Sequence, residues 1–251
     1  MADEFVLRTS GLTKEFRGFF AVNGVDLCVR RDTIHALIGP NGAGKTTCFN
    51  LLTKFLNPTA GRIYYNGEDI TRTTPADVAR KGLVRSFQIS AVFPHLSALE
   101  NVRIALQRTR GGSFDFWRSQ SVLSGLNERA CELLESVGLL SFAHVKADEL
   151  SYGRKRSLEI ATTLALDPQV MLLDEPMAGM GREDVGRISA LIRKVSANRT
   201  ILMVEHNLSV VAELSDVITV LARGKVLAEG DYATVSNDPR VVEAYIGVGH
   251  A

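Results

Sequence analysis

The sequence predicts an α/β fold in which helices cover both faces of a parallel sheet. Strand-length apolar runs alternate with helical patterns along residues 35–56 and 170–222, as in strands joined by crossover helices. The N-terminal strand patterns follow one another directly and indicate an antiparallel β edge. The middle of the chain, residues 89–168, lacks convincing strands and is predicted to be an inserted α-helical subdomain.

The elements follow in order along the chain. Short β patterns at 5–10, 25–29 and 62–67 form the antiparallel edge, and the apolar run 35–38 precedes a helical pattern at 46–56. The later part of the core contains predicted strands at 170–174, 200–205 and 216–222, and predicted helices at 183–197 and from Asn207 onward.

These patterns predict two domains. The core consists of residues 1–88 and 169–251, and the helical subdomain occupies 89–168. Within the subdomain, residues 108–121 form a connection rich in Gly, Ser and Arg, and the helical patterns lie at 98–107, 127–140 and 153–165.

Composition excludes several classes of protein. The 251 residues carry a formal net charge of +1, which argues against a nucleic-acid-binding surface. Apolar runs are far shorter than the ~20 residues of a spanning helix. The N-terminus has no apolar segment typical of a secretion signal. The three cysteines have no metal-binding spacing and are expected to be reduced thiols of a cytosolic protein.

A glycine-rich stretch follows the strand at 35–38 and opens the next helix. It matches the phosphate-binding pattern G-x-x-x-x-G-K-[ST] in the required strand–loop–helix context. Lys45 is predicted to reach the β- and γ-phosphates of a nucleotide, and Thr46 to bind Mg²⁺. The predicted nucleotide contacts are Gly39, Pro40, Asn41, Gly42, Ala43, Gly44, Lys45, Thr46 and Thr47. The alternative is a glycine-rich turn that contains a lysine by chance. It explains the motif poorly, because nine residues and their structural context all match.

A second motif supplies carboxylates at the end of a buried strand. In VMLLDEP, Asp174 is predicted to hold Mg²⁺ through water, and Glu175 to polarise an attacking water. Gln88 follows a short apolar strand, where it would reach the metal or that water. His206 follows another strand, where it would contact a γ-phosphate. A surface glutamine and a structural histidine remain the alternatives for these two residues.

A third motif, LSYGRKR at 150–156, raises an electrostatic question. Ser151 occupies the cap position of a predicted helix, whose first turn carries Arg154, Lys155 and Arg156. Cations are disfavoured there by the helix dipole, so the pattern suggests that an anion is expected at this end.

Together, GPNGAGKTT, Gln88, LSYGRKRSLEIA, VMLLDEP and His206 resemble, in order and spacing, the nucleotide-binding subunit of an ABC transporter. The resemblance covers nearly the whole chain and implies a P-loop (RecA-like) core and an ATPase that uses ATP and Mg²⁺. It also implies a head-to-tail pair of identical or homologous subunits. In that pair, Ser151 and Gly153 contact the γ-phosphate of ATP bound to the other subunit.

The resemblance assigns one further role and reveals two departures from the family pattern. Phe16 stands where family members stack an aromatic ring on adenine, although a core aromatic is equally compatible with the pattern because Phe19 and Phe20 are close by. Arg154 replaces the usual glutamine after the signature glycine. Gly181 replaces an acidic or amide residue in the loop after VMLLDEP.

One subgroup is especially similar. Residues 67–102 and the ending DPRVVEAYIG resemble the ATPases of bacterial importers for branched-chain amino acids, and the connection 108–121 is similar to the larger of the two. The implied partners are transmembrane permease subunits and, indirectly, a periplasmic binding protein. The implied location is the cytoplasmic face of the inner membrane. An importer of urea or amides and a soluble non-transport ABC ATPase remain alternatives.

Overall fold

The computed structural model describes residues 4–86, 92–109 and 125–246. Its internal contacts divide the chain into two units. The first contains Met1–Arg85, Gln169–Met177 and Arg193–Ala251, and the second contains Ser86–Pro168 and Ala178–Ile192. The domain boundaries drawn from the sequence, which left residues 178–192 in the core, stay a prediction.

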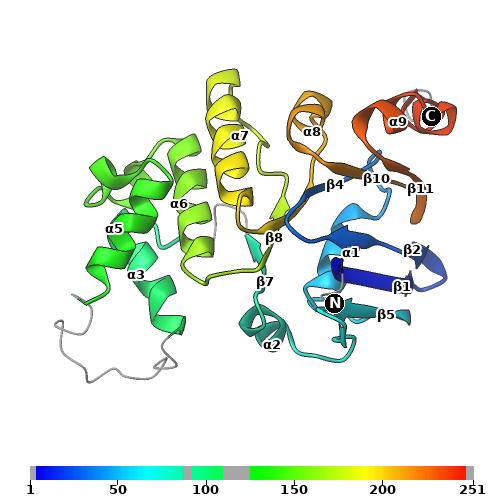
Figure 1. Cartoon of the computed structure of the whole chain (residues 1–251), viewed down its shortest axis with the longest axis horizontal. Helices are drawn as coiled ribbons and strands as arrows, with labels where there is room; N and C mark the ends of the chain where they lie inside the picture. Colours follow the sequence, from blue (N-terminus) through cyan, green and yellow to red (C-terminus); the bar gives the residue numbers. More distant parts are fainter. Residues whose placement is uncertain (1–3, 87–91, 110–124, 247–251) are drawn as a thin grey trace. The chain divides into compact units, whose positions relative to one another are not determined.

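The first unit contains a mostly parallel sheet (Figure 1). Its strand order is β11 (Lys225–Gly230), β10 (Val217–Ala222), β4 (Ile34–Ile38), β9 (Thr200–Val204), β8 (Val170–Asp174) and β7 (Leu83–Ser86). The β10–β4, β4–β9 and β9–β8 pairs are parallel, whereas β11 is antiparallel to β10. Every residue of β4 and β9 is buried, as expected for central strands covered on both faces.

A second sheet of the same unit is antiparallel. Its strands are β2 (Phe19–Val25), β1 (Phe5–Phe16), β5 (Ala60–Tyr65), β6 (Glu68–Asp69) and β3 (Cys28–Arg30), which pairs with β1. The predicted strand at 25–29 is therefore wrong, because β2 ends at Val25 and β3 begins at Cys28. The buried hydroxyl of Thr9 causes the break by donating to the Val25 carbonyl and accepting from the Leu27 N–H.

Five helices complete the described part of the first unit: α1 (Lys45–Leu52), α2 (Pro75–Arg80), α8 (Leu208–Leu214), α9 (Tyr232–Ser236) and α10 (Pro239–Ile246). Helix α1 buries Phe49, Leu51 and Leu52 in one apolar cluster with residues of both sheets. This packing holds α1 in place and therefore positions the glycine-rich loop that directly precedes it. The helix ends before the predicted residue 56, and Lys54 has a left-handed φ of 64°.

The described part of the second unit is helical. Helices α3 (Ala98–Thr109), α5 (Asn127–Ser136) and α6 (Tyr152–Leu164) contact one another, and α7 (Arg182–Ser196) belongs to this unit as far as Ile192. Short 3₁₀ turns lie at Leu140–Phe142 and Ala147–Glu149. The predicted α/β class with an antiparallel region and a helical part is confirmed. Among the described residues, the longest apolar helix falls short of what crossing a membrane requires.

Candidate nucleotide-binding site

The glycine-rich loop links β4 to α1, and its glycines are required by close backbone packing. Gly39 has a φ of 147°, and a Cβ there would lie 2.1 Å from the Leu221 carbonyl oxygen. Gly44 has a φ of 103°, and a Cβ there would lie 2.3 Å from the Ala21 carbonyl oxygen. The loop is thus pressed against β10 and β2 with no room for side chains at these points. Asn41 and Gly42 are exposed at its tip.

Lys45 lies buried at the start of α1 and folds back over the loop. Its Nζ donates to the Gly39 carbonyl at 2.7 Å and to the Pro40 carbonyl at 3.1 Å. Burial lowers the pKa of Lys45, and the charges of Glu175 and Asp174 oppose this shift. The lysine therefore lies within the electrostatic reach of both predicted carboxylates, so three groups from distant parts of the sequence meet at this loop.

Asp174 ends β8 and forms an ion pair with a residue that no sequence motif indicates. Arg85, on β7, forms an ion pair with Asp174 Oδ2 and donates to Asn50 Oδ1 at 2.6 Å. The exposed hydroxyl of Thr46 and the carboxylate of Asp174 are hard oxygen donors, which suit Mg²⁺. The donor set therefore fits the predicted metal. A water-mediated role for Asp174 stays a prediction.

Glu175 and His206 follow the ends of the adjacent strands β8 and β9. Glu175 has a left-handed φ of 45°, and its N–H donates to the Val204 carbonyl at 2.9 Å. Its Oε1 lies 3.9 Å from Nδ1 of His206. Both side chains are substantially exposed, which does not fit a histidine satisfied inside the core. Non-glycine residues in this backbone region cost of order 1–3 kcal/mol, and they cluster at functional sites.

The N-terminus of α6 belongs to the second unit. Ser151 occupies the N-cap position with an extended backbone, and its side chain makes no capping hydrogen bond to the described first turn. A Cβ at Gly153 would lie 2.7 Å from Asp184 Cγ and from Arg187 Nη2, an ion-paired couple on α7. Gly153 therefore allows α6 and α7 to pack closely at this point.

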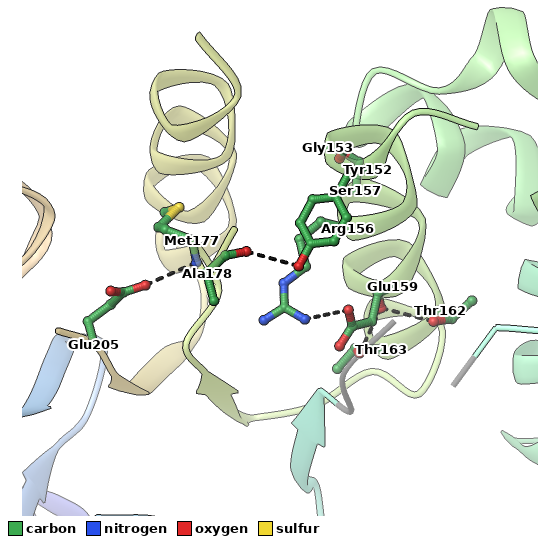
Figure 2. Close-up of polar contacts among 10 residues, drawn as sticks. All are labelled: Tyr152, Gly153, Arg156, Ser157, Glu159, Thr162, Thr163, Met177, Ala178 and Glu205. Atoms are coloured by element: carbon green, nitrogen blue, oxygen red, sulfur yellow. Dashed lines mark hydrogen bonds and ion pairs between the residues drawn. The ribbon is translucent and has the colours of Figure 1, made fainter. Parts of the chain in front are cut away.

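The three cations of the first turn have partners within the same unit, and the expectation that an anion binds at this end of the helix stays a prediction. The Arg154 guanidinium lies 3.9 Å from the centre of the Phe142 ring. Lys155 Nζ donates to the Asp148 carbonyl at 2.9 Å. Arg156 is buried and pairs with the buried Glu159, as Figure 2 shows. The dipole cost is thus offset by a cation–π contact, a hydrogen bond to a nearby backbone carbonyl and an ion pair within the helix.

The remaining predicted residues are placed as follows. Phe16 ends β1 with its ring 44% exposed, which does not fit a core aromatic, and Lys14 Nζ lies 5.1 Å from the ring centre. Adenine stacking by this ring stays a prediction. Gln88 lies outside the described residues. Gly181 is exposed in the loop before α7.

Three residues with contacts described here, Arg85, Glu205 and Tyr152, are not predicted from the sequence. Glu205 is fully buried beside His206, and its carboxylate accepts a backbone hydrogen bond from Met177 (Figure 2). Its position next to a strand-end histidine was the only available signal. For Arg85, whose partner lies 89 residues away, no local signal exists.

Comparisons with known proteins agree with this geometry. Residues 22–178 match the family described as ABC transporter, and residues 225–251 match the family described as branched-chain amino acid ATP-binding cassette transporter. The chain is 40% identical to the high-affinity branched-chain amino acid transport ATP-binding protein BraF of Pseudomonas aeruginosa, over 96% of this chain and 98% of BraF. It is 38% identical to LivG of Escherichia coli K12, with the same coverage.

Solved structures are also similar. The ADP conformation of MJ1267, an ATP-binding cassette of an ABC transporter, superposes with a TM-score of 0.85 at 31% identity, covering 98% of this chain and all of MJ1267. The dimeric structure of MJ0796, a bacterial ABC transporter cassette, gives a TM-score of 0.75 at 25% identity, covering 90% of this chain and 98% of MJ0796.

Proposed function

The chain belongs to the ABC transporter family of ATP-binding cassettes, and from this premise we propose that it powers an importer of branched-chain amino acids by hydrolysing ATP. The observation that carries the cargo class is the 40% identity with BraF across nearly the full length of both chains. The match of residues 225–251 to the branched-chain amino acid cassette family also supports it, since these residues lie beyond the nucleotide motifs.

The proposed site binds the nucleotide on the glycine-rich loop. Backbone N–H groups of residues 41–47 surround the phosphates, and Lys45 exchanges its two loop carbonyls for phosphate oxygens. Thr46 would hold Mg²⁺ directly and Asp174 would hold it through water, with Gln88 as a further ligand. The bound ion would supply positive charge that neutralises the phosphates. Phe16 offers its exposed ring face to adenine.

Glu175 is the proposed general base. Its exposed carboxylate orients a water and takes its proton, while His206, 3.9 Å away, contacts the γ-phosphate. The left-handed backbone of Glu175 turns the chain directly after the buried strand β8. Hydrolysis leaves the phosphate contacts of His206 weaker, which provides a means of sensing the nucleotide state.

The working unit is proposed to be a head-to-tail pair of cassettes. MJ0796, which shares this fold, has a dimeric structure, and the partner here is a second copy or a homologous chain. Ser151 and Gly153 contact the γ-phosphate held by the partner. The Ser151 hydroxyl suits this role because it does not cap its own helix in the described structure.

The remaining proposed partners are transmembrane permease subunits and, through them, a periplasmic binding protein. Phe93 is 53% exposed in the second unit and offers an apolar contact for a permease segment. The complex places this chain at the cytoplasmic face of the inner membrane as a peripheral subunit. The proposal includes no role for nucleic acid.

Glu175→Gln tests the enzymatic proposal. Hydrolysis is expected to fall by about 10²-fold or more, in line with loss of a general base, while ATP binding persists and stabilises a dimer detectable by light scattering. Glu132→Gln, an exposed change on α5, is the control. Near-normal turnover in Glu175→Gln would reject the assignment.

Uptake of labelled leucine tests the cargo. Cells that carry only the Glu175→Gln variant are expected to lose high-affinity leucine uptake and to retain urea uptake. Loss of urea uptake with normal leucine uptake would reject branched-chain amino acids and favour an amide importer.

A further inference from the structure

Glu205 forms a buried carboxylate bridge between two loops of the first unit. Its Oε1 accepts a hydrogen bond from the Met177 N–H at 3.0 Å (Figure 2). Its Oε2 accepts from the His206 N–H at 3.0 Å and from the Asn207 N–H at 3.2 Å. The side chain has no exposed surface. One carboxylate therefore joins the segment after β8 to the segment after β9.

The two joined segments carry the two proposed reactive side chains. Glu175 stands two residues before Met177, and His206 directly follows Glu205. A second hydrogen bond links the same two segments nearer to the strand ends. It runs from the Glu175 N–H to the Val204 carbonyl at 2.9 Å. The Glu205 carboxylate therefore adds a side-chain cross-link to this backbone one.

We propose that Glu205 is a positioning residue that sets the distance between Glu175 and His206 by binding the backbone of both segments. This inference rests on the proposed function, in which those two side chains act on water and the γ-phosphate. Because Glu205 is buried, it touches neither substrate nor metal and works only through its neighbours.

The carboxylate group is specifically suited to this task. It presents only acceptors, and the three N–H groups that face it are donors with no acceptor of their own in the strand ladders. A glutamine of the same shape would turn an NH₂ group toward at least one of them. Either the Met177 bond or the His206 and Asn207 bonds would then be lost, and the loop on that side would be released.

The first test compares Glu205→Gln with Glu213→Gln, the same change at an exposed position on α8. We expect Glu205→Gln to lower kcat by about 10²-fold, which is the size of effect that a misplacement of about 1 Å produces. The dissociation constant of ATP should change by less than about twofold. A purely structural role predicts a weaker ATP affinity and a lower Tm together, with kcat per folded molecule unchanged, and would overturn the proposal.

A double-mutant cycle separates positioning from general damage. In a Glu175→Gln background, adding Glu205→Gln should lower the residual single-turnover hydrolysis by much less than about 10²-fold, because one of the two groups that it positions is already inactive. A further loss of about 10²-fold would overturn the proposal. If Glu205→Gln is fully active while Glu175→Gln is impaired, this inference fails and the proposed function stands. If Glu175→Gln itself is fully active, the proposed function fails.

Amide NMR signals provide a readout independent of activity. In Glu205→Gln, the ¹⁵N–¹H resonances of Met177 or of His206 should shift upfield as their hydrogen bonds to a charged acceptor weaken. Their positions should remain unchanged in Glu213→Gln. Unshifted resonances in Glu205→Gln would show that the bridge persists without the carboxylate and would overturn the proposal.

Discussion

The phenolic oxygen of Tyr152 donates a hydrogen bond to the backbone carbonyl of Ala178 at 2.9 Å (Figure 2). Tyr152 opens α6 directly after Ser151, and Ala178 begins the loop that follows the Glu175 segment. Gly179, with a φ of 74°, lies under the same ring, since a Cβ there would be 3.5 Å from Tyr152 Oη. The segment that is proposed to meet the partner subunit and the loop that follows Glu175 are thus joined within one chain.

Tyr152→Phe removes only this hydrogen bond. The free energy of unfolding should change by less than about 1 kcal/mol, because the bond is exposed. The loop at 178–181 should become less ordered, so the ATP concentration needed for dimerisation in a Glu175→Gln background should rise roughly 2- to 10-fold. Light scattering against ATP concentration measures this. Tyr232→Phe, on α9, is the control, and equal curves for the two variants would refute the prediction.

Phe93→Ala tests the proposed permease contact. Backbone hydrogen bonds, and not the ring, hold the turn that contains Phe93. The Asn101 side chain accepts from the Phe93 N–H at 2.7 Å and donates to the Phe93 carbonyl at 3.1 Å. Removing the exposed ring should therefore leave Tm and the ATPase rate of the isolated subunit within error and abolish transport. Leu140→Ala, another exposed apolar change in the same unit, should transport normally. A joint loss of Tm and ATPase would instead indicate internal packing.

Arg156→Met tests the buried ion pair of α6. Burial raises the pKa of Glu159 to about 7, although Arg156 opposes this. Without Arg156, an ionised Glu159 is left buried and unpaired, which costs about 3–5 kcal/mol. A raised pKa in the folded state means that the carboxyl takes up a proton as the pH falls below 7. The destabilisation should therefore be largest at pH 8 and smaller at pH 5.5, as measured by denaturant unfolding.

Two variants control this experiment. Arg154→Met, two residues earlier, should lose little stability and show no such pH dependence. The double variant Arg156→Met with Glu159→Leu should recover most of the lost stability, because replacing a whole buried pair is far less costly than removing one partner. A double variant as unstable as the single one would contradict this account.

His35 should make the first unit sensitive to acid. Its ring is fully buried, its Nε2 lies 2.8 Å from Thr219 Oγ1, and burial lowers its pKa from 6.5 to about 4. At His35 the unfolded chain therefore binds a proton more readily than the folded chain. The stability that the neutral, buried ring contributes is complete above pH 6.5 and is lost as the pH falls through 4. The difference corresponds to roughly 3 kcal/mol.

Unfolding curves between pH 7 and 4 measure this loss. His35→Gln should flatten the pH dependence, whatever its stability at pH 7, whereas His144→Gln, an exposed change, should retain it. If the free energy of unfolding of His35→Gln depends on pH as steeply as that of the wild type, other groups cause the acid sensitivity.

Local sequence patterns were sufficient to predict those parts of the site that depend on backbone conformation and burial. The stretch 39–47 predicted a strand–loop–helix phosphate site, and β4 and α1 flank it as expected. The strands at 170–174 and 200–205 placed Asp174, Glu175 and His206 at strand ends. Parallel pairing of β8 with β9 then brings these residues together, because the carboxyl ends of parallel strands share one edge.

The sequence alone determined the α/β class, the nucleotide motifs and the family, because glycine spacing and apolar periodicity are local properties of the chain. Only the tertiary structure decided which groups meet. It gave Asp174 the partner Arg85, placed the Arg154 guanidinium over the Phe142 ring, and placed the Glu205 carboxylate between two loops. Such contacts depend on strand order and on the packing of elements distant in sequence, and no pattern within a single segment encodes them.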